Sequence, residues 1–129
     1  MRDMTVYVEL RHPAKELRPN RTSRNNWRPR ARAEKEARGR ARIVALAGMQ
    51  RAGAQRGVFE PVRYRITWLY KGTRPDQDNV VAACKAYLDG CADAFAVNDR
   101  AWTLEPVELV HDKERAGWMV IAFSDGETI

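Results

Sequence analysis

The chain has few of the residues that build zinc or disulfide sites. It contains two cysteines and two histidines in 129 residues. Cys84 and Cys91 are seven positions apart within one predicted helix. That spacing is about 10 Å along the helix axis, too far for a disulfide between them. We therefore expect both cysteines to be reduced core residues.

Long apolar segments are also missing. No run approaches the ~20 residues that a membrane-spanning helix needs, and the first residues, MRDMTVYVEL, lack the pattern of a signal peptide. There is no internal repeat and no low-complexity region. With 44% hydrophobic and 31% charged residues, the chain is typical of one soluble globular domain over residues 1–129. We expect a cytoplasmic protein with no membrane partner.

Positive charge is concentrated in one segment. Between Arg11 and Arg42 there are twelve Lys and Arg residues against three Glu, a net charge of +9, so the rest of a chain with total charge +6 carries −3. Ten of the twelve are arginine, whose planar fork suits bidentate contacts to phosphate. This pattern indicates a polyanionic partner, with nucleic acid as the first candidate. A basic but merely solvated helix face is the alternative.

Four segments have the pattern of β-strands. Val6, Val8 and Leu10 alternate with polar residues, and residues 62–70 (VRYRITWLY) are β-branched and aromatic. Residues 104–111 and 117–123 read as two further strands, and we expect these two to form a hairpin.

Two segments have the pattern of helices. One starts at Pro29, after a loop over residues 12–28, and continues to Ala52; we expect its first half to face solvent or a ligand and its second half to pack. The other covers residues 80–95, with apolar residues at helical spacing on one face. The order β-α-β-α-β-β predicts an α+β fold, a small mixed sheet with two helices packed on it.

The acidic residues after the second predicted strand are the most informative. Asp76 and Asp78 are two positions apart, and Asp99 follows the predicted helix. Three hard carboxylates without histidine or cysteine ligands suit Mg²⁺ or Mn²⁺ and not zinc, which predicts a divalent-metal nuclease. The structural alternatives are that Asp78 or Asn79 caps the helix and that residues 98–99 form a turn.

These motifs occur in an order that is similar to a known family. The segment Pro75-Asp76-Gln77-Asp78-Asn79, a helix with Lys85 and Asp89-Gly90, and Asn98-Asp99-Arg100 resemble the signature of the RusA-type Holliday-junction resolvases. Residues 17–20 (LRPN) and 26–28 (NWR), the basic helix and the terminal strands are similar to the phage members. The resemblance covers nearly the whole chain.

The resemblance implies a Mg²⁺-dependent homodimer, encoded by a phage or prophage, that nicks four-way DNA junctions symmetrically. It implies that Asp76, Asp78 and Asp99 bind the metal and act in catalysis. The chain departs from the family pattern at two positions. Asn98 stands where many members have the first of two aspartates, and Ala82 stands where one member has a functional lysine, with Lys85 one turn later. Lys85 is thus the candidate catalytic lysine, or else it only pairs with Asp89 at i, i+4.

The expected DNA-binding residues lie in the basic segment and beside the acidic motif. Trp27 is a candidate for stacking or wedging at the branch point, or else an ordinary partly buried aromatic residue. Two other functions remain open, a branched-DNA-binding protein that has lost catalysis and a nuclease for flaps or forks. The predicted DNA contacts are Asn20, Arg21, Arg24, Trp27, Arg28, Arg30, Arg32, Lys71 and Arg74.

Overall fold

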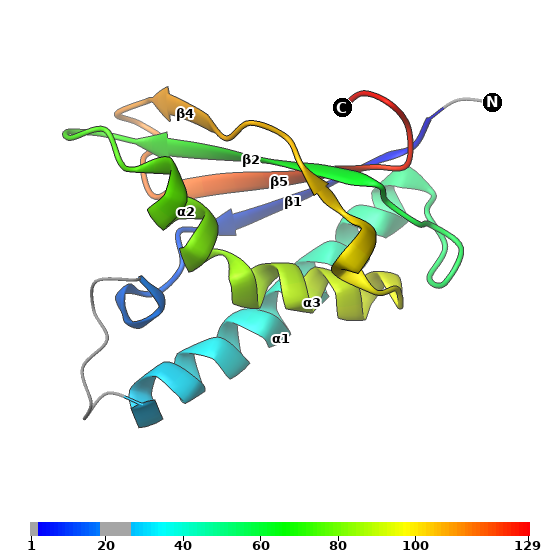
Figure 1. Cartoon of the computed structure of the whole chain (residues 1–129), viewed down its shortest axis with the longest axis horizontal. Coiled ribbons are helices and arrows are strands. Elements are labelled where there is room, and N and C mark those ends of the chain that lie inside the picture. Colours follow the sequence, from blue (N-terminus) through cyan, green and yellow to red (C-terminus); the bar gives the residue numbers. More distant parts are fainter. Residues whose placement is uncertain (1–2, 19–26) are drawn as a thin grey trace.

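A computed structural model describes residues 3–18 and 27–129, without the side chain of Trp27. The fold is α+β, as the sequence predicts. In these residues, a mixed sheet of five strands has three α-helices on one side, and its other face is open (Figure 1). In chain order the elements are β1 (Thr5–Arg11), the 3-10 turn η1 (Lys15–Leu17), α1 (Trp27–Ala52), β2 (Arg63–Tyr70), α2 (Gln77–Ala83), α3 (Lys85–Phe95), the 3-10 turn η3 (Asp99–Ala101), β3 (Thr103–Leu104), β4 (Glu108–His111) and β5 (Trp118–Ser124).

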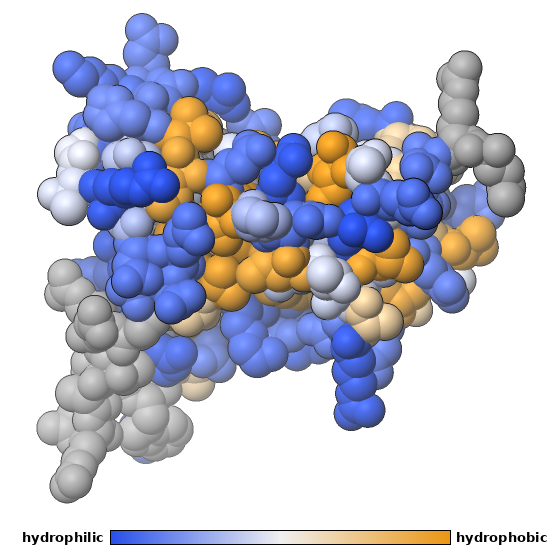
Figure 2. Space-filling model, turned by 45° about the horizontal axis from the view of Figure 1, so that its top comes forward, coloured by the Kyte–Doolittle hydropathy of each residue, from blue (hydrophilic) through white to orange (hydrophobic). Residues whose placement is uncertain are grey.

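The core lies between the sheet and the helices. Alternating residues of β1 and β5 are buried on the helix side, among them Val6, Val8, Ile121 and Phe123. Phe95 at the end of α3 is also fully buried, and its ring meets that of Phe123 edge to face with centroids 4.9 Å apart. On the opposite face of the sheet, hydrophobic residues lie between hydrophilic ones (Figure 2). The predicted alternation of the strands is confirmed.

The predicted hairpin of the last two strands is wrong. β2 lies between β4 and β5: it pairs with β4 in parallel, Thr67 opposite Glu108, and with β5 antiparallel, Ile66 opposite Ile121. β5 also pairs antiparallel with β1, which makes β5 and β2 the central strands. Sequence order favours a hairpin between neighbours, but the apolar β2 and β5 gain more burial in the centre.

Two predicted elements are each divided in the structure. The strand expected over residues 104–111 is two short strands, β3 and β4, with Pro106 between them, which has no N–H to donate to the sheet. The helix expected over residues 80–95 starts earlier and is split into α2 and α3. At Cys84, φ is −90° and ψ is 0°, and its N–H bonds to the carbonyl of Val81, three residues back. This tighter turn redirects the chain, so that α3 crosses α1 (Figure 1).

The prediction for how α1 packs is confirmed for the second half of the helix and wrong for the first half, where Ala33 and Ala37 are also buried. Its buried face is a line of small residues over the whole helix, while the larger Ile43 is 70% exposed and Leu46 is 37% exposed. Small residues are needed because α1 runs close to both α3 and β1. A Cβ added at Gly48 would lie 2.5 Å from the carbonyl oxygen of Tyr7. The buried residues of α1 are Ala33, Ala37, Ala41, Ala45, Gly48 and Met49.

We expect Gly90→Ala to destabilise the fold because α1 and α3 touch at this residue. A Cβ there would run into the backbone carbonyl of Arg38 and lie 2.9 Å from the Cβ of Ala41. Overpacking of this kind costs about 1–3 kcal/mol. Gly39→Ala is the matched control, because its Cβ would meet nothing within 4 Å, and it should stabilise the helix by roughly 0.5–1 kcal/mol. Urea unfolding of both variants tests this, and equal midpoints would contradict it.

Both cysteines are free and buried, as the sequence predicts. Burial in apolar surroundings raises the pKa of the Cys84 thiol to about 12 and raises the pKa of Cys91 as well. Thiols in this environment are protonated and unreactive. Cys84 and Cys91 therefore serve as small core residues between the helices and the sheet.

Candidate functional site

The acidic motif begins at the amino end of α2. Asp76 is the N-cap, and its Oδ1 accepts the backbone N–H groups of Asp78 at 2.8 Å and Asn79 at 3.4 Å. The cap is thus Asp76 and neither of the two residues considered from sequence. Asp76, Asp78 and Asn79 are all exposed. Since only Oδ1 of Asp76 is used by the cap, its Oδ2 and the carboxylate of Asp78 face solvent.

Asp76 should therefore contribute to stability as well as to any chemistry. Replacing an aspartate N-cap by alanine costs about 0.5–2 kcal/mol. We expect Asp76→Ala to lower the free energy of unfolding, measured in urea, by this amount, whereas Asp76→Asn, which keeps a capping oxygen, should stay near the native value. Asp78→Asn should also leave stability nearly unchanged, because no side-chain bond of Asp78 is present among the described residues. An Asp76→Ala variant as stable as the native chain would contradict the capping role.

A cavity of about 670 Å³ opens beside this motif. It lies at the end of β2 and is lined by Lys71, Asn79 and Arg18, with His12 and Trp68 in its wall. The two rings stack with centroids 3.7 Å apart, and His12 Nε2 donates to the carbonyl of Trp118 at 3.0 Å. Burial lowers the pKa of His12, so the ring is neutral near pH 7. Lys71 and Arg74 are exposed next to the acidic motif, at the positions expected from sequence.

Asp99 lies at the other end of the helical pair. Ala96 ends α3 in the left-handed conformation with φ 59°, and Asn98 then caps η3 by accepting the N–H of Arg100 at 2.9 Å. Asp99 is the first residue of η3 and is half-buried. The turn considered from sequence for residues 98–99 is therefore present. Asn98 has a structural role, since its side-chain oxygen closes that turn.

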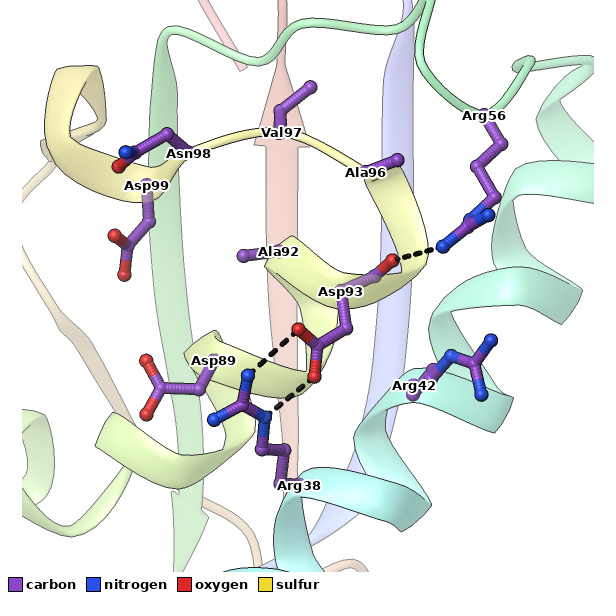
Figure 3. Close-up of a pocket in the computed structure, with 10 residues that line it drawn as sticks. All are labelled: Arg38, Arg42, Arg56, Asp89, Ala92, Asp93, Ala96, Val97, Asn98 and Asp99. Carbon is purple, nitrogen blue, oxygen red and sulfur yellow. Dashed lines mark hydrogen bonds and ion pairs between the residues drawn. The ribbon is translucent and has the colours of Figure 1, made fainter.

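Asp99 faces a groove between α1 and α3, which we call the α1–α3 groove (Figure 3). Its volume is about 760 Å³. Asp89 and Asp99 lie at one side of it, Arg42 and Arg56 at the other, and the pair of Arg38 with Asp93 lies between them (Figure 3). The lining residues are Arg38, Arg42, Arg56, Asp89, Ala92, Asp93, Ala96, Val97, Asn98 and Asp99.

Asp93 holds two arginines in place at this groove. Arg38 Nε and Nη2 donate to its two carboxylate oxygens at 2.6 and 2.9 Å, and Arg56 Nη2 donates to its backbone carbonyl at 3.2 Å. The hydrogen bond from Arg38 lowers the pKa of Asp93. This pair stabilises the fold above the pKa of an unfolded aspartate, ~3.9, and the effect is lost as the pH falls through the lower folded value. The side chains are 54% and 35% exposed, so water screens the pair and its contribution is small.

Lys85 forms the ion pair with Asp89 that the sequence offers as the structural alternative to a catalytic role. Its Nζ lies 3.7 Å from Asp89 Oδ1 in an i, i+4 pair, and its side chain is 78% exposed. Such a pair is worth a few tenths of a kcal/mol. A role of Lys85 in catalysis stays a prediction.

The three predicted metal ligands do not form one cluster within the chain. Residues 3–18 and 27–129 contain no group of three or more His, Cys, Asp or Glu side chains that could hold a metal ion. Asp76 caps α2 and Asp78 lies in its first turn, whereas Asp99 lies beyond α3. The 11 residues of α3 alone measure roughly 16 Å. That these aspartates bind a metal stays a prediction, and a single chain does not bring the three side chains together.

The predicted DNA contacts of the basic segment are described only in part. Asn20, Arg21, Arg24 and the side chain of Trp27 lie outside the described residues. Arg28 and Arg32 line a shallow hollow at the start of α1. Arg30 is half-buried, pairs with Glu34 at 3.1 Å and donates to the Glu16 carbonyl. Part of the basic segment is therefore engaged in local structure.

Sequence reasoning missed the cations of the α1–α3 groove. In the sequence, Arg38 and Arg42 stand out only as part of the basic segment, Asp93 only as a polar residue of the second predicted helix, and Arg56 not at all. Arg38 and Asp93 are 55 residues apart in sequence and meet only because α1 packs on α3. No local signal in the sequence indicates that contact.

A comparison with known proteins places the chain in a family. No protein-family model matches it. An uncharacterized protein of Xylella fastidiosa (strain Temecula1 / ATCC 700964) is 41% identical over 123 residues, which covers 91% of this chain and 74% of that protein. The chain belongs to the family of that Xylella protein. The family thus shares most of the domain described above.

One further finding concerns membranes. Among the residues that the structure describes, none of the helices combines the length and the apolar character needed to span a bilayer.

Proposed function

We propose that this protein is a Mg²⁺-dependent endonuclease that resolves four-way DNA junctions by paired symmetric nicks. One observation carries the proposal: unpaired carboxylates and unpaired cations stand side by side at the start of α2. Among the described residues, Asp76, Asp78, Lys71 and Arg74 form no ion pair with one another or with other side chains. Unpaired carboxylates suit a metal ion, and unpaired cations suit phosphates. This part of the surface therefore suits DNA that is bound together with a metal ion. The resemblance to the RusA-type resolvases supports the same function.

The residues at this position fit Mg²⁺ in their chemistry. Mg²⁺ prefers oxygen ligands and is often held by one or two carboxylates together with substrate phosphates. Oδ2 of Asp76 and the carboxylate of Asp78 offer such ligands, with Mn²⁺ as a substitute. When bound, the metal would activate water and stabilise the charge that develops on the phosphate. Asp76 is oriented for this role by its own cap bonds, which fix its side chain.

The neighbouring cations would bind the DNA and leave the chemistry to the carboxylates. Lys71 and Arg74 lie within a few residues of the acidic motif and are exposed, so they are placed to contact a phosphate of the same strand. The basic segment, including Arg28 and Arg32, would contact phosphates further along a junction arm. Lys85 would contribute only if it leaves its weak pair with Asp89.

A homodimer accounts for the separation of the aspartates. Two symmetric nicks need two sites, and a two-fold dimer matches the symmetry of the junction. If the three aspartates act together, the Asp76 end of one chain must lie beside Asp99 of its partner, because α2 and α3 separate them within one chain. The buried face of α3 is covered by α1, which leaves the edge formed by β3 and β4, with Leu104 and Val110 exposed, as the candidate contact.

A second candidate function is branched-DNA binding without cleavage. It is favoured by Asn98, whose side chain caps η3 at the position where many resolvases have an acidic residue. A broader nuclease that cuts flaps or forks would use the same residues and differs only in substrate.

The test is cleavage of a labelled four-way junction beside a linear duplex of the same sequence, with Mg²⁺ and with EDTA. Paired nicks at symmetric positions in the junction alone, and only with Mg²⁺, are the expected result. Tight binding to the junction with no nicks would favour the binding protein. Equal cutting of flaps and forks would favour the broader nuclease.

A further inference from the structure

The α1–α3 groove contains more cationic side chains than its own ion pairs need. Arg38 donates two hydrogen bonds to Asp93, and Lys85 pairs with Asp89 from the adjoining surface. Arg56 donates one N–H to the backbone carbonyl of Asp93. Arg42 makes no hydrogen bond or ion pair with any described residue, and no dashed line reaches it in Figure 3.

Asp93 organises these cations without neutralising all of them. Its carboxylate compensates the charge of Arg38, and its carbonyl orients Arg56. Arg42 and Arg56 both line the groove, and their guanidinium groups lie at the same side of it (Figure 3). Two guanidinium groups on one wall, with five N–H donors each in a planar fork, form a binding site for phosphate oxygens.

The length of the groove matches a short piece of a DNA strand. From Asp89 to Ala96, α3 measures roughly 10 Å, or about three nucleotides at 3.4 Å each along one strand of a duplex. The carboxylates of Asp89 and Asp99 repel phosphate at one side, whereas Arg42 and Arg56 attract it at the other (Figure 3). A strand that lies across the groove with one phosphate near Asp99 therefore presents a further phosphate to the arginines.

We propose that Arg42 and Arg56 bind the DNA backbone next to the phosphate that approaches Asp99. This inference rests on the proposed function, because it takes DNA as the ligand. It assigns a role to Arg56, which lies outside the acidic motif and the basic segment, and gives Arg42, the last residue of the basic segment, a place in the groove that Asp99 faces. These arginines hold the strand and take no part in the chemistry.

The experiment measures how the affinity for a four-way junction depends on salt, in EDTA so that no DNA is cut. Each phosphate contact contributes about 0.9 to the slope of log affinity against log salt. The double variant Arg42→Gln/Arg56→Gln should lower the slope by roughly two, with weaker binding at every salt concentration. Arg51→Gln is the control, since Arg51 is exposed on α1 but does not line the groove, and its slope should remain near the native value.

The outcomes separate this inference from the proposed function. If the native protein binds and cuts junctions and the double variant has the slope of Arg51→Gln, the groove does not bind DNA and the nuclease proposal stands. If the slope falls as expected but the native protein never cuts, the groove is supported and cleavage is not. If the native protein shows no salt-dependent binding to DNA, both proposals are overturned.

Discussion

Asp78→Asn is expected to abolish Mg²⁺-dependent cleavage of a four-way junction while binding is kept or strengthened. The change removes one carboxylate ligand and keeps the size of the side chain. Charge stabilisation by a catalytic metal is worth several kcal/mol, and each ~1.4 kcal/mol is a factor of ten in rate. The cleavage rate should therefore fall by about a hundredfold or more.

Binding should respond in the opposite direction because Asp78 faces solvent where DNA phosphate would approach. Removing its negative charge lowers the repulsion between protein and DNA. Single-turnover cleavage gives the rate, and a gel-shift titration in EDTA gives the affinity. Asp78 is preferred to Asp76 for this test because Asp76 also caps α2. Replacing Asp76 would change the stability of the fold as well as the cleavage rate.

Glu60→Gln is the matched control. It removes the same charge from an exposed residue before β2, at the end of that strand away from Asp78, and should cut junctions at the native rate. Cleavage by Asp78→Asn at a rate close to that of Glu60→Gln would show that Asp78 binds no essential metal.

A mixture of Asp78→Asn and Asp99→Asn is expected to regain activity that neither variant has alone. The chain places these residues at opposite ends of the α2–α3 pair, and its described part has no cluster of three ligands. In a two-fold dimer that completes each site with Asp99 of the partner, a mixed dimer has one doubly altered site and one intact site. Random exchange of equal amounts gives about half mixed dimers, so about one quarter of all sites are intact.

The measurement is nicking of a labelled junction after the two variants have been unfolded and refolded together. The separately refolded variants, combined only at the time of assay, show how much exchange occurs without refolding. Binding of Mn²⁺ at equilibrium should recover in the same proportion, which gives a second readout that does not depend on cleavage. A refolded mixture as inactive as its components would mean that the aspartates of different chains do not share a site.

The sequence by itself determined the class of the fold and the chemistry of the candidate residues. Alternating apolar residues in β1, β2 and β5 follow from the two-residue period of a strand, and this period is visible without tertiary contacts. The same is true of the exposed acidic motif, because charged residues beside a loop seldom become buried. The burial of Cys84 and Cys91 was likewise predictable from their position on an apolar helix face.

Only the tertiary structure decided which elements lie side by side. Strand pairing depends on competition for the centre of the sheet, so β2 came to separate β4 from β5 although the sequence favoured a hairpin. The close contact of α1 with α3, which needs Gly90 and a line of alanines, brings Arg38 to Asp93 and opens the groove that Arg42 and Arg56 face. Spacing along the chain shows which face of a helix is apolar, but not which partner covers it. For the same reason the sequence could name three aspartates as ligands, while the fold places them at opposite ends of two helices.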